Sequence, residues 1–325
     1  MKKIIKINQE SKIPLLGLLQ VGIIDRAQNN LIQVRTTTVC NMDCKFCSTN
    51  SKDANIHPND FIVEKYYLIK WIKQAIKLKN SSLNIFIDSV GEPFTHPKFL
   101  ELIQEISKIK DIENIIIITN GTLLNKNLIK ELEKTKVSQL NISIHSLDKE
   151  KSKFLMGSKT YDVDKILNTI NLIYESSMDL VLTPVYIPNI NEKDIEDIIK
   201  LAKQLNCKIA IQKYEKYRFS RKDYKDINYY RFYEYIKELE KKYEIKLNHN
   251  SFDIKFKKVD RIPLIFKKNE KLNVEIRENG WFSNEKIAVF KNRAITILDS
   301  DKSKGDNVNI KIIENKDGIY LAKCI

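Results

Sequence analysis

The chain has 325 residues, of which 42% are hydrophobic and 30% are charged, so it can bury a core and is not a disordered polypeptide. It contains no run of 18 or more apolar residues, which excludes a predicted membrane-spanning helix. Lys6 interrupts the apolar residues at the start, so we predict no signal peptide and no membrane partner.

The charge balance is strongly basic, with 56 Lys and Arg against 42 Asp and Glu and a formal net charge of +14. Such an excess favours an anionic partner, and nucleic acid is the first candidate. The alternative is compositional, because AT-biased codons alone would enrich Lys, Asn and Ile. The charge therefore raises a hypothesis of nucleic-acid binding without identifying the surface.

Short β-branched runs alternate with amphipathic helical stretches through the first two thirds of the chain. We predict strands at 31–36, 83–88, 114–119, 140–144, 180–186 and 207–213, and helices at 60–79, 97–109, 126–135, 162–177 and 192–205. The strands are nearly continuous in apolar residues, as strands buried on both faces are. Strand followed by helix, repeated, predicts an α/β fold with a parallel sheet, open or barrel-shaped, and ligands at the carboxyl ends of the strands.

The pattern changes after a predicted helix at 228–243 and a Lys-rich connector. Five short alternating runs, at 272–277, 286–290, 294–298, 308–313 and 319–323, are separated by turn residues such as Asn279-Gly280. This spacing predicts a small all-β barrel. We therefore predict an N-terminal extension at 1–30, an α/β domain with a helical extension at 31–260, and the β-barrel at 261–325.

Three of the five cysteines lie within eight residues, as Cys40-x3-Cys44-x2-Cys47, directly after the first predicted strand of the α/β domain. Three thiolates on one loop can hold three corners of an iron–sulfur cluster and leave one iron open to a ligand. The alternatives are chance clustering or a structural zinc with His57 as fourth ligand. Few and clustered cysteines indicate a reducing compartment, so we expect a cytoplasmic protein, with Cys207 and Cys324 in structural roles.

The C-x3-C-x-Φ-C pattern, with Phe46 as the aromatic residue, resembles the motif of the radical S-adenosylmethionine (SAM) superfamily. The resemblance covers residues 28–215. It implies a partial (β/α)6 TIM-like barrel, a [4Fe-4S] cluster on Cys40, Cys44 and Cys47, and SAM bound at the fourth iron. It further implies reductive cleavage of SAM to a 5′-deoxyadenosyl radical, and an electron donor such as ferredoxin or flavodoxin.

Residues that follow the predicted strands match further segments of this family, which implies that they contact SAM. Asp88-Ser89-Val90-Gly91-Glu92-Pro93 resembles the G-G-E-P segment, although Val90 replaces its first glycine. His145 stands where the family often has Asp and is a candidate catalytic acid–base group, with a structural role as its alternative. The SAM-contact candidates are Phe46, Gly91, Glu92, Pro93, Thr119, Asn120, Ser143 and Asn189.

The connector after the last predicted strand of the α/β domain combines cations with aromatic residues, a composition suited to single-stranded or looped RNA. A solvated connector is the alternative. The C-terminal barrel resembles a TRAM (OB-like) domain of RNA-modifying enzymes, an arrangement similar to that of mostly archaeal radical SAM proteins. The RNA-contact candidates are Lys213, Lys216, Arg218, Arg221, Lys222, Lys286, Lys291 and Arg293, with Trp281 and Phe290 as aromatic partners.

These observations predict a radical SAM enzyme that modifies RNA, with tRNA as the first candidate. Radical chemistry on a peptide or a small metabolite is the alternative within enzymes. A non-enzymatic RNA-binding protein with a structural metal is the alternative outside them. Methylthiotransferases with a similar C-terminus carry three more cluster cysteines near the N-terminus, and the first 39 residues here contain none, so methylthiolation is less favoured.

Overall fold

The computed structural model describes residues 2–217, 220–221, 223–247 and 255–325. The chain forms two compact units. The first consists of Met1–Cys40, Ser51–Ile115 and Phe256–Ile325, and the second of Asn41–Asn50 and Ile116–Lys255. Among the described residues, no helix combines the length and apolar character needed to cross a bilayer.

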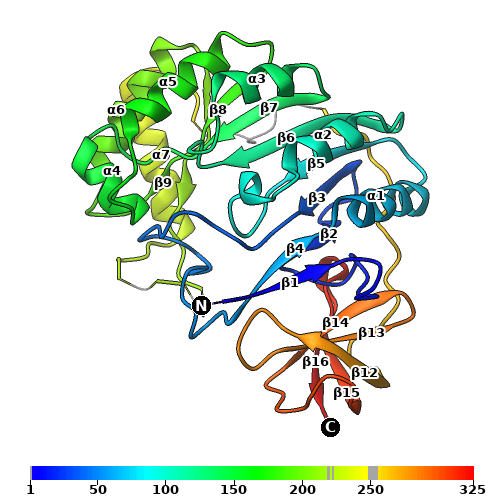
Figure 1. Cartoon of the computed structure of the whole chain (residues 1–325). Coiled ribbons are helices and arrows are strands. Elements are labelled where there is room, and N and C mark those ends of the chain that lie inside the picture. Colours follow the sequence, from blue (N-terminus) through cyan, green and yellow to red (C-terminus); the bar gives the residue numbers. More distant parts are fainter. Residues whose placement is uncertain (1, 218–219, 222, 248–254) are drawn as a thin grey trace. The chain divides into compact units, whose positions relative to one another are not determined.

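The α/β part of the first unit is built on parallel pairing (Figure 1). Strand β3 pairs in parallel with β5 and antiparallel with β2, and β1 pairs in parallel with β4. The elements are β1 (Lys3–Ile7), β2 (Gly22–Ile24), β3 (Leu31–Arg35), β4 (Asn59–Val63), α1 (Lys65–Lys79), β5 (Leu83–Ile87), the 3-10 helix η1 (Pro93–Thr95) and α2 (Phe99–Ser107).

The beginning of helix α1 differs from the prediction. The sequence predicts a helix from residue 60, but Asn59–Val63 is strand β4, with alternating buried and half-buried side chains. Parallel pairing with β1 satisfies this backbone, and the helix begins only at Lys65. Glu64 caps it by accepting the N–H groups of Tyr66 and Tyr67 at 3.0 and 2.8 Å.

The second unit continues the strand–helix alternation. Strand β6 begins in the first unit and ends in the second, where the strand order is β6-β7-β8-β10, and β9 pairs separately with β11. Its elements are β6 (Ile112–Thr119), α3 (Lys126–Glu133), β7 (Val137–Ile142), α4 (Lys149–Met156), α5 (Val163–Tyr174), β8 (Asp179–Leu182), β9 (Val185–Tyr186), α6 (Glu192–Gln204), β10 (Lys208–Ile209), β11 (Gln212–Lys213) and α7 (Tyr229–Tyr243). The predicted α/β class is confirmed.

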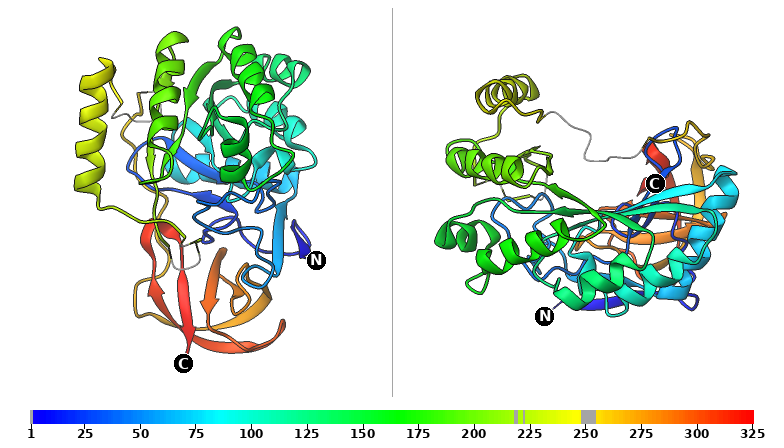
Figure 2. Two further views of the ribbon diagram at one scale, coloured as in Figure 1. Left: turned by 90° about the vertical axis from the view of Figure 1, so that its left-hand side faces the viewer. Right: turned by 90° about the horizontal axis from the view of Figure 1, so that it is seen from above.

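The C-terminal strands close into a five-stranded barrel in the order β12-β13-β14-β16-β15 (Figures 1 and 2). They are β12 (Lys271–Asn279), β13 (Lys286–Phe290), β14 (Arg293–Leu298), β15 (Asn307–Glu314) and β16 (Leu321–Cys324), with the 3-10 helix η2 (Lys316–Gly318) between the last two. Alternate residues such as Val274, Ile276, Ile295 and Ile310 fill its core with Tyr320. The predicted small β-barrel is confirmed.

A loop near the N-terminus is bonded to this barrel within the first unit. Ala294 donates its N–H to Leu16 at 2.9 Å, and Tyr320 donates to Gly17 at 3.0 Å. Gly17 has a φ of 119°, and a Cβ there would lie 2.0 Å from the Ala294 carbonyl oxygen. Only glycine therefore fits this contact.

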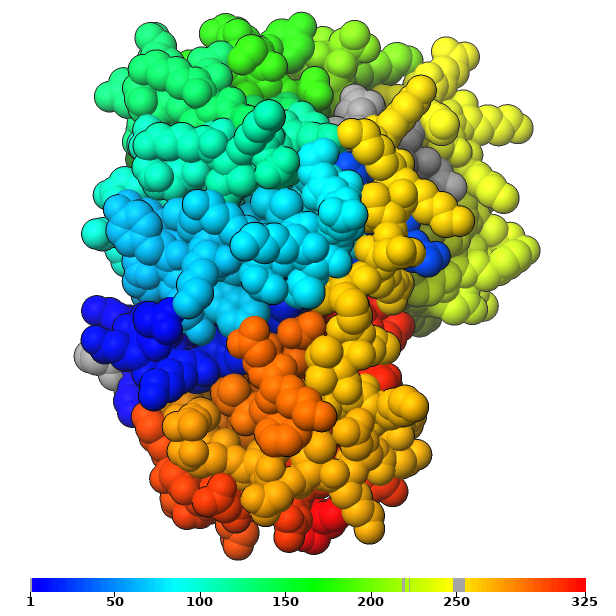
Figure 3. Space-filling view, turned by 90° about the vertical axis from the view of Figure 1, so that its right-hand side faces the viewer, coloured from blue at the N-terminus to red at the C-terminus, as the bar shows by residue number. Residues whose placement is uncertain are grey.

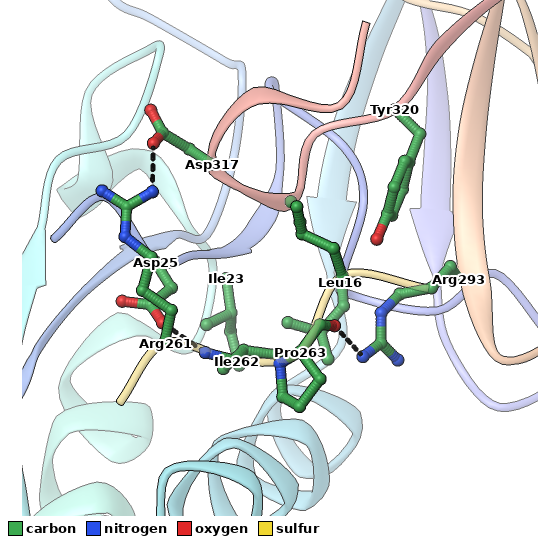
Figure 4. A pocket seen from close by; sticks show the side chains of 11 residues that line it. Leu16, Ile23, Asp25, Arg261, Ile262, Pro263, Arg293, Asp317 and Tyr320 are labelled. Carbon is green, nitrogen blue, oxygen red and sulfur yellow. Dashed lines mark hydrogen bonds and ion pairs between the residues drawn. The ribbon is translucent and has the colours of Figure 1, made fainter. Parts of the chain in front are cut away.

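A segment that we call the strap, residues 256–266, leads into the barrel along the surface of the first unit (Figure 3). Lys257 exchanges hydrogen bonds with Asn30, and the Ile262 N–H donates to the Asp25 carboxylate at 2.7 Å. The same carboxylate accepts two bonds from the buried Lys79 ammonium at 2.8 Å. Figure 4 shows this end of the strap, where Arg261 pairs with Asp317 around a cavity of about 60 Å³.

Candidate functional site

We define the cysteine loop as residues 41–50, which carry Cys44 and Cys47 in the second unit; Cys40 ends the preceding segment of the first unit. All three thiols are half-buried, and no disulfide joins the cysteines in the described part of the chain. The Cys47 N–H donates to the Cys44 carbonyl at 3.1 Å, so these two sulfurs belong to one tight turn.

The end of helix α4 holds the backbone of the cysteine loop. The Asp43 and Lys45 N–H groups donate to the carbonyls of Met156 and Leu155 at 3.2 and 2.8 Å. Gly157 follows in the left-handed conformation with φ of 60°, and a Cβ there would lie 1.8 Å from the Asp43 carbonyl oxygen. The loop is thus seated on a helix end that only glycine can form.

The turn after β6 holds the same loop by side chains. Asn120 donates to the Asn41 side-chain oxygen at 2.9 Å, and Asn41 donates to the Thr122 hydroxyl at 2.8 Å. The Asn120 oxygen in turn accepts the Thr122 N–H at 3.0 Å. Thr119 accepts the N–H of Gly121, whose φ of 75° makes the turn. Two of the predicted SAM contacts therefore have a structural role here. Thr119 stabilises this turn, and Asn120 binds the cysteine loop through Asn41.

Arg221 forms the third attachment. Its guanidinium pairs with the Asp43 carboxylate and donates from Nε to the Asn50 side chain at 3.1 Å, so it joins both ends of the loop. The Arg221 carbonyl accepts the Tyr214 hydroxyl at 2.6 Å. This residue, predicted as an RNA contact, is engaged inside the second unit.

Phe46, a residue of the cysteine loop, packs against the cluster of Leu155 and Tyr214, and its ring centroid lies 4.2 Å from that of His145. His145 is buried, and its Nδ1 accepts the Val185 N–H at 3.0 Å. Burial lowers the pKa of His145 to about 3. The ring is therefore neutral at pH 7, with Nδ1 committed and the proton on Nε2.

The sulfur atoms of the loop have soft or weakly polar neighbours. Cys44 Sγ lies 3.8 Å from Met156 Sδ, and Cys47 Sγ lies 3.3 Å from the Thr49 hydroxyl. Burial, followed by the negative charge of a Cys44 thiolate, raises the pKa of Tyr161. Half-buried cysteines of this kind can supply the thiolate ligands that iron–sulfur clusters use.

In the first unit, the Gly91–Pro93 segment fixes the backbone that leads into Cys40. The Glu92 N–H and the Thr95 hydroxyl both donate to the Val39 carbonyl, at 2.8 and 3.0 Å. A Cβ at Gly91 would lie 2.0 Å from the same oxygen. Glu92 is 3% exposed and caps η1 through the N–H of Phe94. The glycine of the predicted G-E-P match is thus required by a close backbone approach.

The remaining predicted SAM contacts lie at two strand ends of the second unit. The Ser143 N–H donates to Thr119, and its hydroxyl lies 3.5 Å from that of Thr183. Asn189 is exposed with a φ of 63°, and its N–H donates to the Glu192 carboxylate at the start of α6. Ser143 and Asn189 therefore place polar groups just after the ends of strands β7 and β9.

His57 and His96, the two histidines of the first unit, have packing roles. His57 stacks on Trp281 with ring centroids 3.7 Å apart, and His96 binds the Val63 carbonyl through Nε2 at 2.7 Å. In the described ranges, no three His, Cys, Asp or Glu side chains converge as the ligands of one metal ion.

The predicted RNA contacts are dispersed. Lys213 pairs with Asp226 at 2.5 Å, and Lys286 donates to Asn279 at 2.7 Å. Arg293 is only 5% exposed and donates to the Pro263 carbonyl at 3.4 Å, as Figure 4 shows. Trp281 is likewise buried. The exposed members are Lys216 and Lys291, and Arg218 and Lys222 lie outside the described residues.

Two functional contacts were not predicted from the sequence. The approach of Gly157 to Asp43 could have been suspected, because a glycine after a helix in a chain with only eight glycines marks a constrained position. The Arg221–Asp43 pair spans a sequence separation of 178 residues, and no local pattern reports it.

A model of the radical SAM superfamily matches residues 34–202, and the chain belongs to this superfamily. The family uses a [4Fe-4S] cluster and S-adenosylmethionine, and the protein is an iron–sulfur, SAM-dependent enzyme. Three half-buried cysteines on a backbone fixed by close glycine contacts fit such a cluster.

Solved structures show the fold. A radical SAM methyltransferase from Sphaerobacter thermophilus superposes with a TM-score of 0.54 at 15% identity, covering 70% of this chain and 67% of that one. Streptococcus suis SuiB, bound to its precursor peptide SuiA, gives 0.53 at 20% identity over 67% of this chain and 47% of SuiB. The α/β part is accordingly the partial TIM barrel of this family.

Among curated proteins, the uncharacterized protein MJ0103 of Methanocaldococcus jannaschii is 31% identical over 354 residues, covering 100% of this chain and 81% of the relative. GTP 3′,8-cyclase of Aquifex aeolicus is 26% identical over 184 residues, covering 57% of this chain and 56% of the cyclase. The chain thus spans little more than half the length of that cyclase.

Proposed function

We propose that Cys40, Cys44 and Cys47 hold the cluster and that the enzyme uses SAM to modify an RNA, with tRNA as the first candidate. Once bound there and reduced by an electron donor such as ferredoxin or flavodoxin, a [4Fe-4S] cluster would supply the one electron needed to cleave SAM to methionine and a 5′-deoxyadenosyl radical. The single observation that carries this proposal is the fixed cysteine loop. A loop that is already held in place pays little conformational entropy when it binds a cluster.

Three attachments do this holding in the second unit. Gly157 seats the Asp43 carbonyl, Asn120 binds Asn41, and Arg221 ties Asp43 to Asn50. The guanidinium also adds a positive charge beside a loop that would carry thiolates. That charge favours the ionised thiols which iron requires.

We further propose that the polar groups at the strand ends bind SAM. Glu92 would accept from its ammonium group, and Asn120 and Ser143 would contact its amino-acid or ribose portion. Asn189 would approach the adenine, and Phe46 would pack beside the cysteines. His145 is a neutral packing residue in this proposal, because its Nδ1 is committed to Val185.

An RNA substrate is supported by the net charge of +14 and by the closed C-terminal barrel. Part of the connector predicted as an RNA path is neutralised internally, since Lys213 and Arg221 pair with carboxylates. That observation favours a second candidate, a small nucleotide or metabolite. The name of the GTP 3′,8-cyclases indicates that relatives of this chain act on such a molecule.

The experiment begins with anaerobic purification and cluster reconstitution. About four irons and four sulfides per chain, with reductive cleavage of SAM, are expected. A Cys207→Ala variant serves as the matched control, since Cys207 lies outside the motif. One bound zinc without SAM cleavage would contradict the proposal.

The substrate is tested separately. Nucleoside mass spectrometry compares tRNA from a deletion strain with tRNA from the parent strain, and the missing nucleoside should reappear when purified enzyme acts on the deletion-strain tRNA. If the tRNA nucleosides are unchanged and the enzyme instead modifies a nucleotide or a small metabolite, the second candidate is correct and the RNA substrate is not.

A further inference from the structure

One outer face of the barrel places lysines directly beside one another. The strand register pairs Lys271 of β12 with Lys311 of β15, and Lys311 with Lys323 of β16. The alternation of buried and exposed residues turns all three side chains outward. We call these three residues the lysine row; it crosses three strands and spans about 10 Å.

The charges of this row are only partly compensated. Lys323 lies 3.4 Å from the Asp299 carboxylate. Within the described part of the chain, no carboxylate lies within ion-pair distance of Lys271 or Lys311. Like charges placed directly opposite on adjacent strands destabilise a sheet. An anionic ligand across the row would relieve that repulsion.

A neutral polar pair lies next to the lysine row on the same face. Asn273 pairs in register with Asn309, and its amide donates to the Asn309 oxygen at 2.9 Å. One amide oxygen and further N–H groups of the two side chains are not used in this bond. A shallow groove of about 560 Å³ is lined by Lys271, Leu272, Asn273, Asn309 and Ile325.

We propose that this face binds the sugar–phosphate backbone of an RNA strand, with phosphates on Lys271 and Lys311 and a ribose or base edge on the Asn273–Asn309 pair. Lysine ammonium groups act as point charges, which suits contacts to phosphate without sequence selection. The proposal rests on the RNA substrate proposed above. It places the contact away from Lys286 and Lys291, the two lysines of the barrel that the sequence analysis predicted as RNA contacts.

The test measures the affinity of the full-length protein for an unmodified tRNA transcript as a function of salt. The variant Lys271→Glu/Lys311→Glu should bind at least tenfold more weakly. The slope of log affinity against log salt concentration should become less negative by about 1.5–2. The control Lys286→Glu/Lys291→Glu makes the same change of charge on β13 and its turn. Its affinity should remain within about twofold of the wild type.

A second measurement separates a ligand site from simple damage. Lys311→Gln removes one repulsive charge, so the melting temperature at low salt should rise by about 1–3 °C while RNA affinity falls. A lower melting temperature, or an unchanged affinity for RNA, would overturn the assignment of this face.

The outcomes distinguish the two proposals. A wild-type protein that binds RNA, with the charge reversal at Lys271 and Lys311 without effect, overturns this inference and leaves the RNA substrate intact. A wild-type protein that binds no tRNA overturns both. SAM cleavage should be unchanged in all these variants, because the lysine row lies outside the residues proposed to bind the cluster and SAM.

Discussion

The cysteine loop and the outer face of the barrel use their polar side chains in opposite ways. Around the loop, Asn120 donates to Asn41 and Arg221 donates to Asn50, and these hydrogen bonds hold the backbone in place. On the barrel, Lys271 and Lys311 point outward in register. A cation near a candidate site can therefore be part of the scaffold, whereas one on a regular sheet can be available to a ligand.

The comparison also explains why counting charges along the sequence misplaces a binding surface. The stretch 213–222 is rich in cations, but two of them compensate carboxylates. Cations are spaced more widely along the barrel strands, yet strand register brings Lys271, Lys311 and Lys323 side by side. Whether a cation is available to a ligand therefore depends on its neighbours in space and not on its neighbours in the sequence. The expected effects that test this distinction follow, from the largest to the smallest.

In the cysteine loop, removal of one cluster ligand should abolish both iron binding and SAM cleavage. Cys44→Ala should lose nearly all reconstituted iron and all SAM cleavage, because two thiolates cannot replace three. Iron analysis and electron paramagnetic resonance of the reduced protein measure this. Cys207→Ala should retain both properties, and a Cys44→Ala protein that keeps four irons would refute the ligand assignment.

Replacement of Gly157 should unseat the loop. Gly157→Ala places a methyl group at 1.8 Å from the Asp43 carbonyl, so we expect the free energy of unfolding to fall by about 2–4 kcal/mol, with poorer iron retention. Urea denaturation measures it. Gly305→Ala is the matched control, with φ of 94° and nothing within 4 Å, and should lose only about 1 kcal/mol.

The buried His145 should make stability depend on pH. Its pKa is about 3 in the folded protein, below the unfolded value of about 6.5. Between these values the unfolded chain binds the extra proton, so stability is full above about pH 6.5 and falls with decreasing pH. We expect a loss of about 2 kcal/mol between pH 7 and 5. Urea titrations of the wild type and of His145→Gln measure it, and equal slopes would contradict this role.

The ion pair of Arg221 should have the smallest effect on the loop side. Arg221→Gln removes a partly exposed pair with Asp43 and should lower the free energy of unfolding by about 1 kcal/mol, while cluster loss in air becomes faster. A double-mutant cycle with Asp43→Asn isolates the coupling between the two side chains. If Arg221→Gln instead weakens RNA binding without changing cluster loss, Arg221 belongs with the ligand-binding cations.

The sequence was sufficient where local pattern and structure share a cause. Apolar runs such as Ile115–Ile117 predicted buried strands, and turn residues such as Gly280 and Gly305 predicted the strand divisions of the barrel. It was insufficient where distant partners decide the outcome. Residues 60–63 form a strand because β1 pairs with them, and Arg293 is buried with its guanidinium bonded to the Pro263 carbonyl of the strap. Of the candidate site, motif spacing indicated the cysteines and Gly91, but not Gly157 or the engagement of Arg221.

The contacts of Leu16 and Gly17 with Ala294 and Tyr320 have a consequence for how the chain is made. Nearly 300 residues separate these partners, so the hydrogen bonds between them form only after almost the whole polypeptide has left the ribosome. Contacts of such long range slow folding. An isolated C-terminal fragment would lack the N-terminal loop to which Ala294 and Tyr320 are hydrogen-bonded. Studies of the barrel will therefore need that loop to be supplied.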